Sequence, residues 1–544
     1  MKNGKKLLSL LLVGSMALSL AACGDDAATT PSSDAASASS EADASASSEA
    51  DASGSEAADV DLSERVDLVF YVPGDAPTDE LVVEEAINEK LLEKLNATVD
   101  FQFTTWTDFQ TKYSNELLAG TPDLIYIANW FNYGTFAKEG AFLELDELLP
   151  TYAPKLTELC GTYLDQCKVD GAIYAVPAMW PEYVSSGITY REDLRAKYDL
   201  PVPNSIENLE AYLLGIQENE PNQGLLLPTT GDSTGLSHAF DAAWILNFKY
   251  PWVTTNGLSY GLSANADSPS QVYDYWFSDD FVDDMKLMKK WAGYGFWSKS
   301  ALSDTNDSES FKNGLCVASF WGQNPAKCNT NKNDFETAGQ GWEAEYVAFG
   351  ETTGVIYPGH ATQNGTAIVR GCENPERALM VLEYFMTDEE MYRLVQYGIE
   401  GTHYQFDENG YYQTIMNDDG TSNFGSEAFN TWNLRNAEFK LGNESDERLQ
   451  KVFDRLEAIG AKCKYPNTDI AAGFTEVYDD YAAERTAISN VMRTYLAPLQ
   501  AGLVDDVDAA VEEFRTKVNE AGREKVVEAY KAQWAAYCES MGYE

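Results

Sequence analysis

Near the start of this chain, short apolar runs alternate with helical patterns, and this alternation limits the fold more than any other feature. Apolar runs at 66–72, 97–103 and 122–127 have the length and residue types of strands. Between them, 79–95 and 107–118 carry apolar residues near helical spacing. The order strand, helix, strand, helix, strand predicts an α/β fold with a parallel sheet.

Tryptophans follow the ends of several predicted strands. Trp106 and Trp130 come just after the second and third strands, and Trp180 follows a further strand at 172–176. Ligands bind to open α/β sheets outside the carboxyl ends of the strands, so these indoles are candidates for a stacking platform on one binding face. Each could equally fill a hydrophobic core, and both interpretations stay open.

Two further tryptophans lie among polar residues. Trp321 follows a strand-like run at 315–319, and Trp432 lies in a segment rich in asparagine. The chain has 12 Trp and 31 Tyr; most of them should be core residues, but flat rings also suit binding surfaces. A sugar ring has an apolar C–H face and a rim of hydroxyls. Indoles beside Asp, Glu and Asn therefore favour an oligosaccharide ligand.

Length and charge limit the remaining classes. About 480 residues follow the N-terminal segments, too many for one core, so two or three domains or lobes are expected. The formal net charge of −49 repels nucleic acid and anionic lipid, which makes both poor partners. Neutral or cationic ligands are favoured, although strong acidity also serves solubility alone.

The first 23 residues have the pattern of a secretion signal. Three lysines precede an apolar run at 7–20 that is too short to span a bilayer. The run ends in Leu-Ala-Ala-Cys, which resembles the bacterial lipobox, whose cysteine, here Cys23, is lipidated and becomes the new N-terminus. Ordinary signal-peptide cleavage is the alternative. Residues 24–63 carry ten acidic residues and no basic or aromatic residue, which predicts a disordered tether.

Cysteine and histidine usage argues against a metal site, and no cofactor is expected. Besides Cys23 the chain has seven cysteines at irregular spacing, no C-x-x-C, and three histidines. Cys160 and Cys167 are the best disulfide pair, while free buried thiols are expected for most cysteines. Segments 407–410 and 417–420 faintly resemble calcium loops but lack the full pattern, and hairpin turns explain both better.

Segments spread over most of the chain resemble one family. Residues 140–148 are similar to its G-A-F-L-P-L-D segment, and 170–177 to its G-K-I-Y-A-I-P strand. The family is that of the extracellular solute-binding lipoproteins of ABC importers, family 1, carbohydrate type, in the Firmicute group with a DUF3502-like C-terminal module. The segments that carry the resemblance are 117–126, 140–148, 170–177, 374–379, 397–404 and 473–475.

This resemblance implies a type II periplasmic-binding-protein-like fold, in which two α/β lobes joined by hinge strands clamp a ligand between them. Lobe one would hold 64–187 and 352–398, and lobe two 188–351, with 399–544 as a helical C-terminal region. The implied partners are an oligosaccharide or other small solute and an ABC permease. The chain would be held by lipid on the outer face of the cytoplasmic membrane.

Three residues outside the tryptophans are further binding candidates. Glu400 and His403 lie in a glycine-flanked loop, where a carboxylate and an imidazole could hydrogen-bond sugar hydroxyls. A structural loop lock is the alternative, since the family keeps this motif whatever it binds. His360, which follows Tyr-Pro-Gly, is the third candidate.

Catalytic motifs give little support for an enzyme, and none is expected. The chain lacks H-E-x-x-H and a Gly-rich phosphate loop. A glycoside hydrolase, however, needs only two carboxylates at a fixed separation, and 87 acidic residues leave such a pair open. A secreted glycoside hydrolase and a surface polysaccharide adhesin without transport are the alternatives to an importer component.

Overall fold

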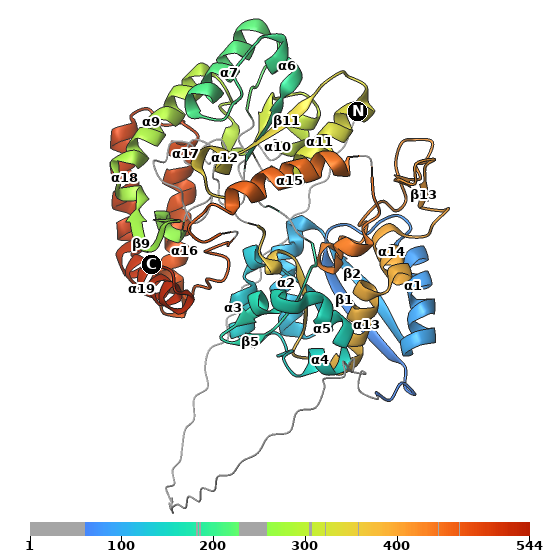
Figure 1. The fold of residues 1–544 in the computed structure, drawn as a ribbon. Helices are drawn as coiled ribbons and strands as arrows, with labels where there is room; N and C mark the ends of the chain where they lie inside the picture. Colours follow the sequence, from blue (N-terminus) through green and yellow to red (C-terminus); the bar gives the residue numbers. More distant parts are fainter. Residues whose placement is uncertain are drawn as a thin grey trace, which may run out of the picture. The chain divides into compact units, whose positions relative to one another are not determined.

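The computed structural model describes residues 60–180, 183, 187–227, 258–303, 307–320, 323–356, 358–443, 445–466 and 468–544 (Figure 1). Two candidate residues, Cys23 and Trp321, lie outside the described residues, as does nearly all of the tether expected at 24–63. Among the described residues, no helix combines the length and the hydropathy that a membrane span requires.

The predicted strands of the N-terminal region form a five-stranded sheet in the order β2-β1-β3-β12-β6. Strand β1 pairs in parallel with β2 and β3, as expected, and β12 and β6 continue the sheet in antiparallel pairs. The strands are β1 (Val66–Pro73), β2 (Ala97–Thr104), β3 (Leu124–Ile127), β6 (Val176–Pro177) and β12 (Gly365–Ile368). The parallel strands end at one edge of the sheet, and Trp106 and Trp130 follow there.

Helices connect and cover this sheet. Helix α1 (Glu80–Leu95) joins β1 to β2, and its buried residues Val83, Ile87, Leu91 and Leu95 repeat every four positions, the spacing of one helix face. Helix α2 (Trp106–Ala119) joins β2 to β3. It begins before the expected position 107 because Thr105 is its N-cap: the Thr105 hydroxyl accepts a hydrogen bond from the Asp108 backbone N–H at 3.4 Å.

Two more helices, α13 (Pro375–Thr387) and α14 (Glu389–Tyr397), contact α1 and complete this layer. The layer around the five-stranded sheet is called lobe one below.

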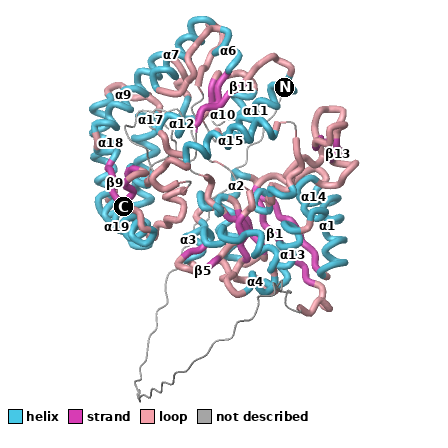
Figure 2. Tube along the Cα trace, viewed as in Figure 1, coloured by secondary structure: helices cyan, strands magenta, loops and turns pink. Residues whose placement is uncertain are grey.

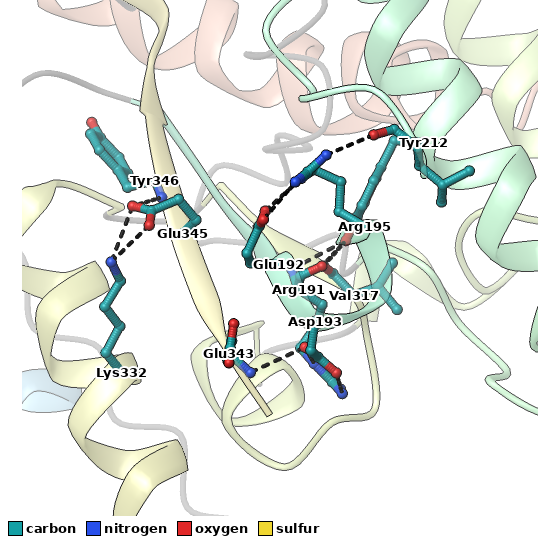
Figure 3. Close-up of polar contacts among 11 residues, drawn as sticks. Arg191, Glu192, Asp193, Arg195, Tyr212, Val317, Lys332, Glu343, Glu345 and Tyr346 are labelled. Atoms are coloured by element: carbon teal, nitrogen blue, oxygen red, sulfur yellow. Dashed lines mark hydrogen bonds and ion pairs between the residues drawn. The ribbon is translucent and has the colours of Figure 1, made fainter. Parts of the chain in front are cut away.

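A second sheet has three antiparallel strands in the order β10-β7-β11. They are β7 (Gly187–Arg191), β10 (Ala318–Ser319) and β11 (Ala344–Ala348). Tyr212 on α7 (Ile206–Asn219) fixes that helix to the sheet. Its hydroxyl donates to the Val317 carbonyl at 3.0 Å and accepts from the Arg191 backbone N–H at 3.1 Å (Figure 3). The layer around this sheet is called lobe two.

The C-terminal tail is helical, as expected, and belongs to the core of lobe two. Phe514 and Trp534 are fully buried in the same cluster as Trp291 of helix α9 (Asp279–Tyr294). The Trp534 Nε1 donates to the Pro269 carbonyl at 2.7 Å. The tail helices are α16 (Ala482–Val491), α17 (Ala497–Gln500), α18 (Val507–Glu520) and α19 (Arg523–Met541).

Part of the segment after 398, which we expected to follow lobe two, packs instead on lobe one. Phe424, Phe429 and Leu434 join the core cluster of lobe one. The Phe429 ring stacks on Phe101 of β2 with centroids 4.7 Å apart. These aromatic side chains lie in irregular backbone, so no strand or helix period in the sequence indicates which lobe they bury against.

Both short acidic segments in this region form turns, as the hairpin interpretation predicts. Strands β13 (Tyr404–Phe406) and β14 (Tyr412–Thr414) form a hairpin (Figure 2). In its turn, the Asp407 carboxylate accepts from the Tyr411 backbone N–H at 2.9 Å. In the second turn, the Asp419 carboxylate accepts from the Thr421 backbone N–H at 3.0 Å.

Candidate ligand-binding site

Three of the predicted tryptophans, Trp106, Trp130 and Trp432, form one aromatic group. The Trp106 ring lies 5.8 Å from that of Trp432 and 6.3 Å from that of Trp130, measured between centroids. Trp106 is 45% exposed and Trp130 54%, whereas Trp432 is half-buried. Large apolar side chains are seldom this exposed, so Trp106 and Trp130 do not serve as core residues.

The backbone positions Trp130 through the turn that follows β3. Trp130 is the central residue of a 3-10 turn, Asn129–Phe131. Its Nε1 donates to the Gln363 carbonyl at 3.1 Å, which fixes the plane of the indole while leaving most of the ring open.

Trp432 is held by its two neighbours in sequence, which are both fully buried. The Gln396 amide donates to the Thr431 carbonyl at 3.1 Å, and the Asn433 amide donates to the Thr366 hydroxyl at 2.7 Å. Buried hydrogen bonds on both sides fix the backbone, so the orientation of the Trp432 ring is set by lobe one.

A cavity of about 460 Å³ lies beside Trp130. The turn after β3 and the following helix α3 (Tyr133–Lys138) form one wall, and residues 469–485 form part of the opposite wall. The first wall belongs to lobe one, and 469–485 pack with lobe two. The polar residues of the opposite wall include Asp469, Thr475, Glu476 and Arg485.

Trp180 and His360 line a larger cavity of about 970 Å³. The Trp180 ring lies 5.1 Å from the Arg435 guanidinium and 5.6 Å from the Lys440 ammonium. These cations contact the indole face through cation–π attraction. Cations therefore flank the Trp180 ring, whereas the Trp106 ring is flanked by other indoles. Residues of the tail, among them Tyr537, also line this cavity.

His360 is a neutral hydrogen-bonding group in this cavity. Its Nδ1 lies 2.7 Å from the Thr362 hydroxyl. Burial lowers the pKa of His360 to about 4, because the imidazolium is poorly solvated there. At neutral pH the ring is uncharged and suits a neutral hydroxyl better than an anion.

Asp469 lines both cavities. Its carboxylate accepts a hydrogen bond from the Ala471 backbone N–H at 3.3 Å. Burial nevertheless raises the pKa of Asp469 to about 6, since the backbone N–H groups of Ala471 and Ala472 compensate only part of the lost hydration. This carboxyl group therefore changes charge just below neutral pH.

His403 and Glu400 do not share this location. The His403 side chain is 2% exposed; its Nδ1 accepts from the Ile399 backbone N–H at 2.9 Å, and its Nε2 lies 3.2 Å from the Asp79 carboxylate. Glu400 is exposed, and neither residue lines the two cavities. These contacts fit the loop-lock alternative, in which His403 ties the loop after α14 to the start of α1.

The polar wall of the smaller cavity was missed by sequence reasoning. The residues concerned are Asp469, Thr475, Glu476 and Arg485. They lie in an irregular loop and the first turn of α16, with no motif among them. The one sequence feature near them is the resemblance at 473–475 to the start of the DUF3502-like module. That resemblance marks a module boundary and does not point to binding residues.

A Gly-x-Ser-x-Gly pattern at 257–261, also overlooked, places Ser259 in the wall of the same cavity. Ser259 begins a 3-10 turn, Ser259–Gly261, that leads into strand β8 (Leu262–Asn265). A hydrolase nucleophile of this pattern lies instead between a strand and a helix, with a histidine beside it. None of the described residues that line the cavity is a histidine.

The seven cysteines of the described part are all free thiols, so the candidate disulfide between Cys160 and Cys167 is not formed. Both are buried, and burial raises the pKa of the Cys160 thiol to about 12. Among the described residues, no group of three or more His, Cys, Asp or Glu side chains is arranged to hold a metal ion.

Two α/β lobes with ligand-sized cavities between them, lined by aromatic and polar side chains, define the class of two-lobe solute-binding proteins. The family described as bacterial extracellular solute-binding protein matches residues 73–392, and the chain belongs to this family. A domain of unknown function, DUF3502, matches residues 470–539 in the tail. The resemblance that the sequence motifs carry is confirmed.

Similar proteins cover nearly the same length. A carbohydrate ABC transporter substrate-binding protein of Streptococcus pneumoniae is 25% identical over 477 residues, which are 85% of this chain and 89% of the relative. The crystal structure of the N-glycan transport solute binding protein NgtS of S. pneumoniae has a TM-score of 0.68 at 22% identity, covering 88% of this chain and 99% of that one.

An HMO-binding, ABC-transporter-associated solute binding protein from Bifidobacterium longum infantis has a TM-score of 0.62 at 15% identity. The match covers 87% of this chain and 99% of that one. At these identities the two solved structures establish the two-lobe fold.

Proposed function

We propose that this chain is the carbohydrate-binding component of an ABC importer and captures an oligosaccharide between its two lobes. The observation that carries the proposal is the exposure of Trp130 in the wall of a cavity whose opposite wall is polar, with the exposed ring of Trp106 next to it. The streptococcal relative, a carbohydrate transporter component by name, supports the same ligand class.

The chemistry of the two walls matches a sugar. The C–H face of a pyranose ring stacks on an exposed indole, which excludes water from both. The hydroxyl rim then meets carboxylate, amide and guanidinium groups that donate and accept hydrogen bonds. Charged partners make these bonds roughly twice as strong as neutral ones.

Import requires that the loaded form differ from the empty form. In a two-lobe protein this difference is hinge closure, which brings the walls of the cleft together over the ligand. The closed, loaded protein then docks on a membrane permease. The affinity for ligand falls in proportion to the fraction of the free protein that is not competent to bind.

The proposal includes an anchor on the outer face of the cytoplasmic membrane. Cys23, at the end of a lipobox-like sequence, would carry the lipid. A flexible chain the length of 24–63 has a reach of roughly 35 Å, enough to keep the lobes near a permease at high effective concentration.

The direct test is a calorimetric and thermal-shift screen of the full chain against defined neutral oligosaccharides and peptides. A true ligand at 100 times its Kd adds about 2.7 kcal/mol to the unfolding free energy. Analysing the incubated sugars by chromatography separates a binding protein from a hydrolase. Binding of peptides but no sugar, or turnover of the sugars, would overturn the proposal.

A further inference from the structure

The tail that matches the domain of unknown function contributes directly to the smaller cavity, and its contribution is chemically specific. Glu476 and Arg485 lie on the wall opposite Trp130. We infer that these two residues recognise a pair of adjacent hydroxyls on a neutral sugar ring that stacks on Trp130. This inference rests on the proposed function and goes further by naming the ring and the residues that select it.

Glu476 is held firmly. Its Oε1 accepts hydrogen bonds from the Tyr260 hydroxyl at 2.6 Å and from the Tyr481 hydroxyl at 3.0 Å. Both tyrosines are buried, and burial raises the pKa of each, so both stay protonated donors. Both tyrosine bonds go to Oε1, which leaves Oε2 as the oxygen to accept a bond from a ligand hydroxyl.

Arg485 is positioned by stacking. Its guanidinium lies 3.9 Å from the centroid of the Tyr478 ring, a close cation–π contact. The guanidinium is planar with several N–H donors, so it can donate to a hydroxyl oxygen while remaining on the ring. A ligand with hydroxyls on two adjacent carbons, a vicinal diol, fits this pair of residues. One hydroxyl would donate to Glu476, and the other would accept from Arg485.

The two walls of the cavity approach each other closely at Gly134 and Thr475. A Cβ added to Gly134, in the lobe-one wall, would lie only 2.0 Å from the Thr475 hydroxyl. The loop that carries Glu476 thus approaches helix α3 directly beside the cavity. With about 460 Å³, the space suits one or two sugar rings rather than a whole oligosaccharide.

The charges of this cavity predict which sugars are rejected. Asp469 and Glu476 are acidic, and Arg485 is basic. A carboxylate on the stacked ring would face two like charges, and like charges at an interface suppress the wrong partner. The site should therefore bind a neutral hexose in preference to the corresponding uronate.

The experiment compares the full-length chain with its Glu476→Gln, Arg485→Gln and Trp130→Ala variants. Isothermal titration calorimetry uses the tightest neutral oligosaccharide from a panel of malto-, manno- and chito-oligosaccharides, together with its uronate counterpart. Glu476→Gln keeps an acceptor for the two tyrosines, so folding should be preserved. Glu528→Gln, an equal charge change at an exposed position on α19, is the matched control.

We expect Glu476→Gln and Arg485→Gln each to weaken binding of the neutral sugar about tenfold or more. Glu476→Gln should also reduce the ratio of the affinity for the neutral sugar to the affinity for the uronate. Trp130→Ala should weaken both sugars alike, and Glu528→Gln should change neither. If Trp130→Ala weakens binding while both polar variants bind as the parent does, the inference is wrong and the proposed function stands. If no sugar of the panel binds, both fail.

Discussion

The indole of Trp106 stacks on that of Trp432, with 5.8 Å between ring centroids and 20° between ring planes. Trp106 begins α2, and Trp432 lies in the segment that returns to lobe one after α14, so tertiary packing brings them together. Trp106 nevertheless stays 45% exposed. A binding surface of this kind is held rigid by its own aromatic neighbours and needs little ordering when a ligand arrives.

Replacing Trp130 by alanine should weaken oligosaccharide binding by about 1 kcal/mol or more, since a stacked ring loses its aromatic partner. The melting temperature of the ligand-free protein should change little, because the indole is 54% exposed. Calorimetric titration and a thermal melt measure the two effects. Trp291→Ala, at a fully buried position of lobe two, is the control and should cost about 3–5 kcal/mol of stability. A comparable loss for Trp130→Ala would make its ring structural.

The sequence predicted the parallel strands well because their apolar runs and connecting helices obey simple periods. The buried positions of α1 are an example. Those periods do not extend to 404–441, where Phe429 meets Phe101 from irregular backbone. Shape complementarity in three dimensions decides which lobe such a segment joins. The lobe-one boundary expected at 398 is therefore wrong, because residues after 398 pack on lobe one.

His403→Ala should lower the free energy of unfolding by about 1–3 kcal/mol, because the partly buried Asp79 carboxylate and the Ile399 N–H each lose a partner. Ligand affinity should stay unchanged, since His403 lines neither cavity. Urea denaturation and calorimetric titration test the two statements. The exposed neighbour Glu400→Ala serves as control and should alter neither. A loss of affinity at full stability would instead give His403 a binding role.

The candidate site was predictable only in its aromatic half. An indole after a strand end is visible in a sequence, as Trp106 and Trp130 show, although only the fold reveals that they are exposed. Glu476 and Arg485 lack such a signal. Each is an ordinary charged residue until the tail packs beside lobe two and places both opposite Trp130.

Asp469→Asn should stabilise the protein at pH 7.5 and have little effect at pH 4. The pKa of Asp469 is raised to about 6 in the folded state. Above that pH the carboxylate is ionised in the folded protein, and this poorly solvated charge lowers the free energy of unfolding. The penalty, about 2–3 kcal/mol, is fully present above pH 6 and disappears as the pH falls towards 4. Urea denaturation of both proteins at the two pH values measures the difference. An equal difference at both would exclude titration of Asp469 as the cause.

Cys160 and Cys167 should resist thiol reagents in the folded protein. Both are buried, and burial raises the pKa of each thiol, so almost no thiolate exists at pH 8. Mass spectrometry after brief alkylation should find them unmodified, and half-buried Cys463 modified first. Alkylation in denaturant should modify all three. If Cys160 and Cys167 stay unmodified in denaturant without reductant but are modified once a reductant is added, they form a disulfide.

Cys23→Ser should release the protein from the membrane while leaving ligand binding intact. The thiol is the acceptor for the lipid in the lipobox reading, and without acyl chains the acidic tether offers no affinity for an anionic bilayer. Expression in a Gram-positive host, followed by fractionation and labelling with a clickable palmitate analogue, measures both lipid and location. Ser15→Ala, within the apolar run, is the control and should remain anchored. Retention of the Cys23→Ser protein on membranes, or absence of label from the parent, would contradict lipidation at this residue.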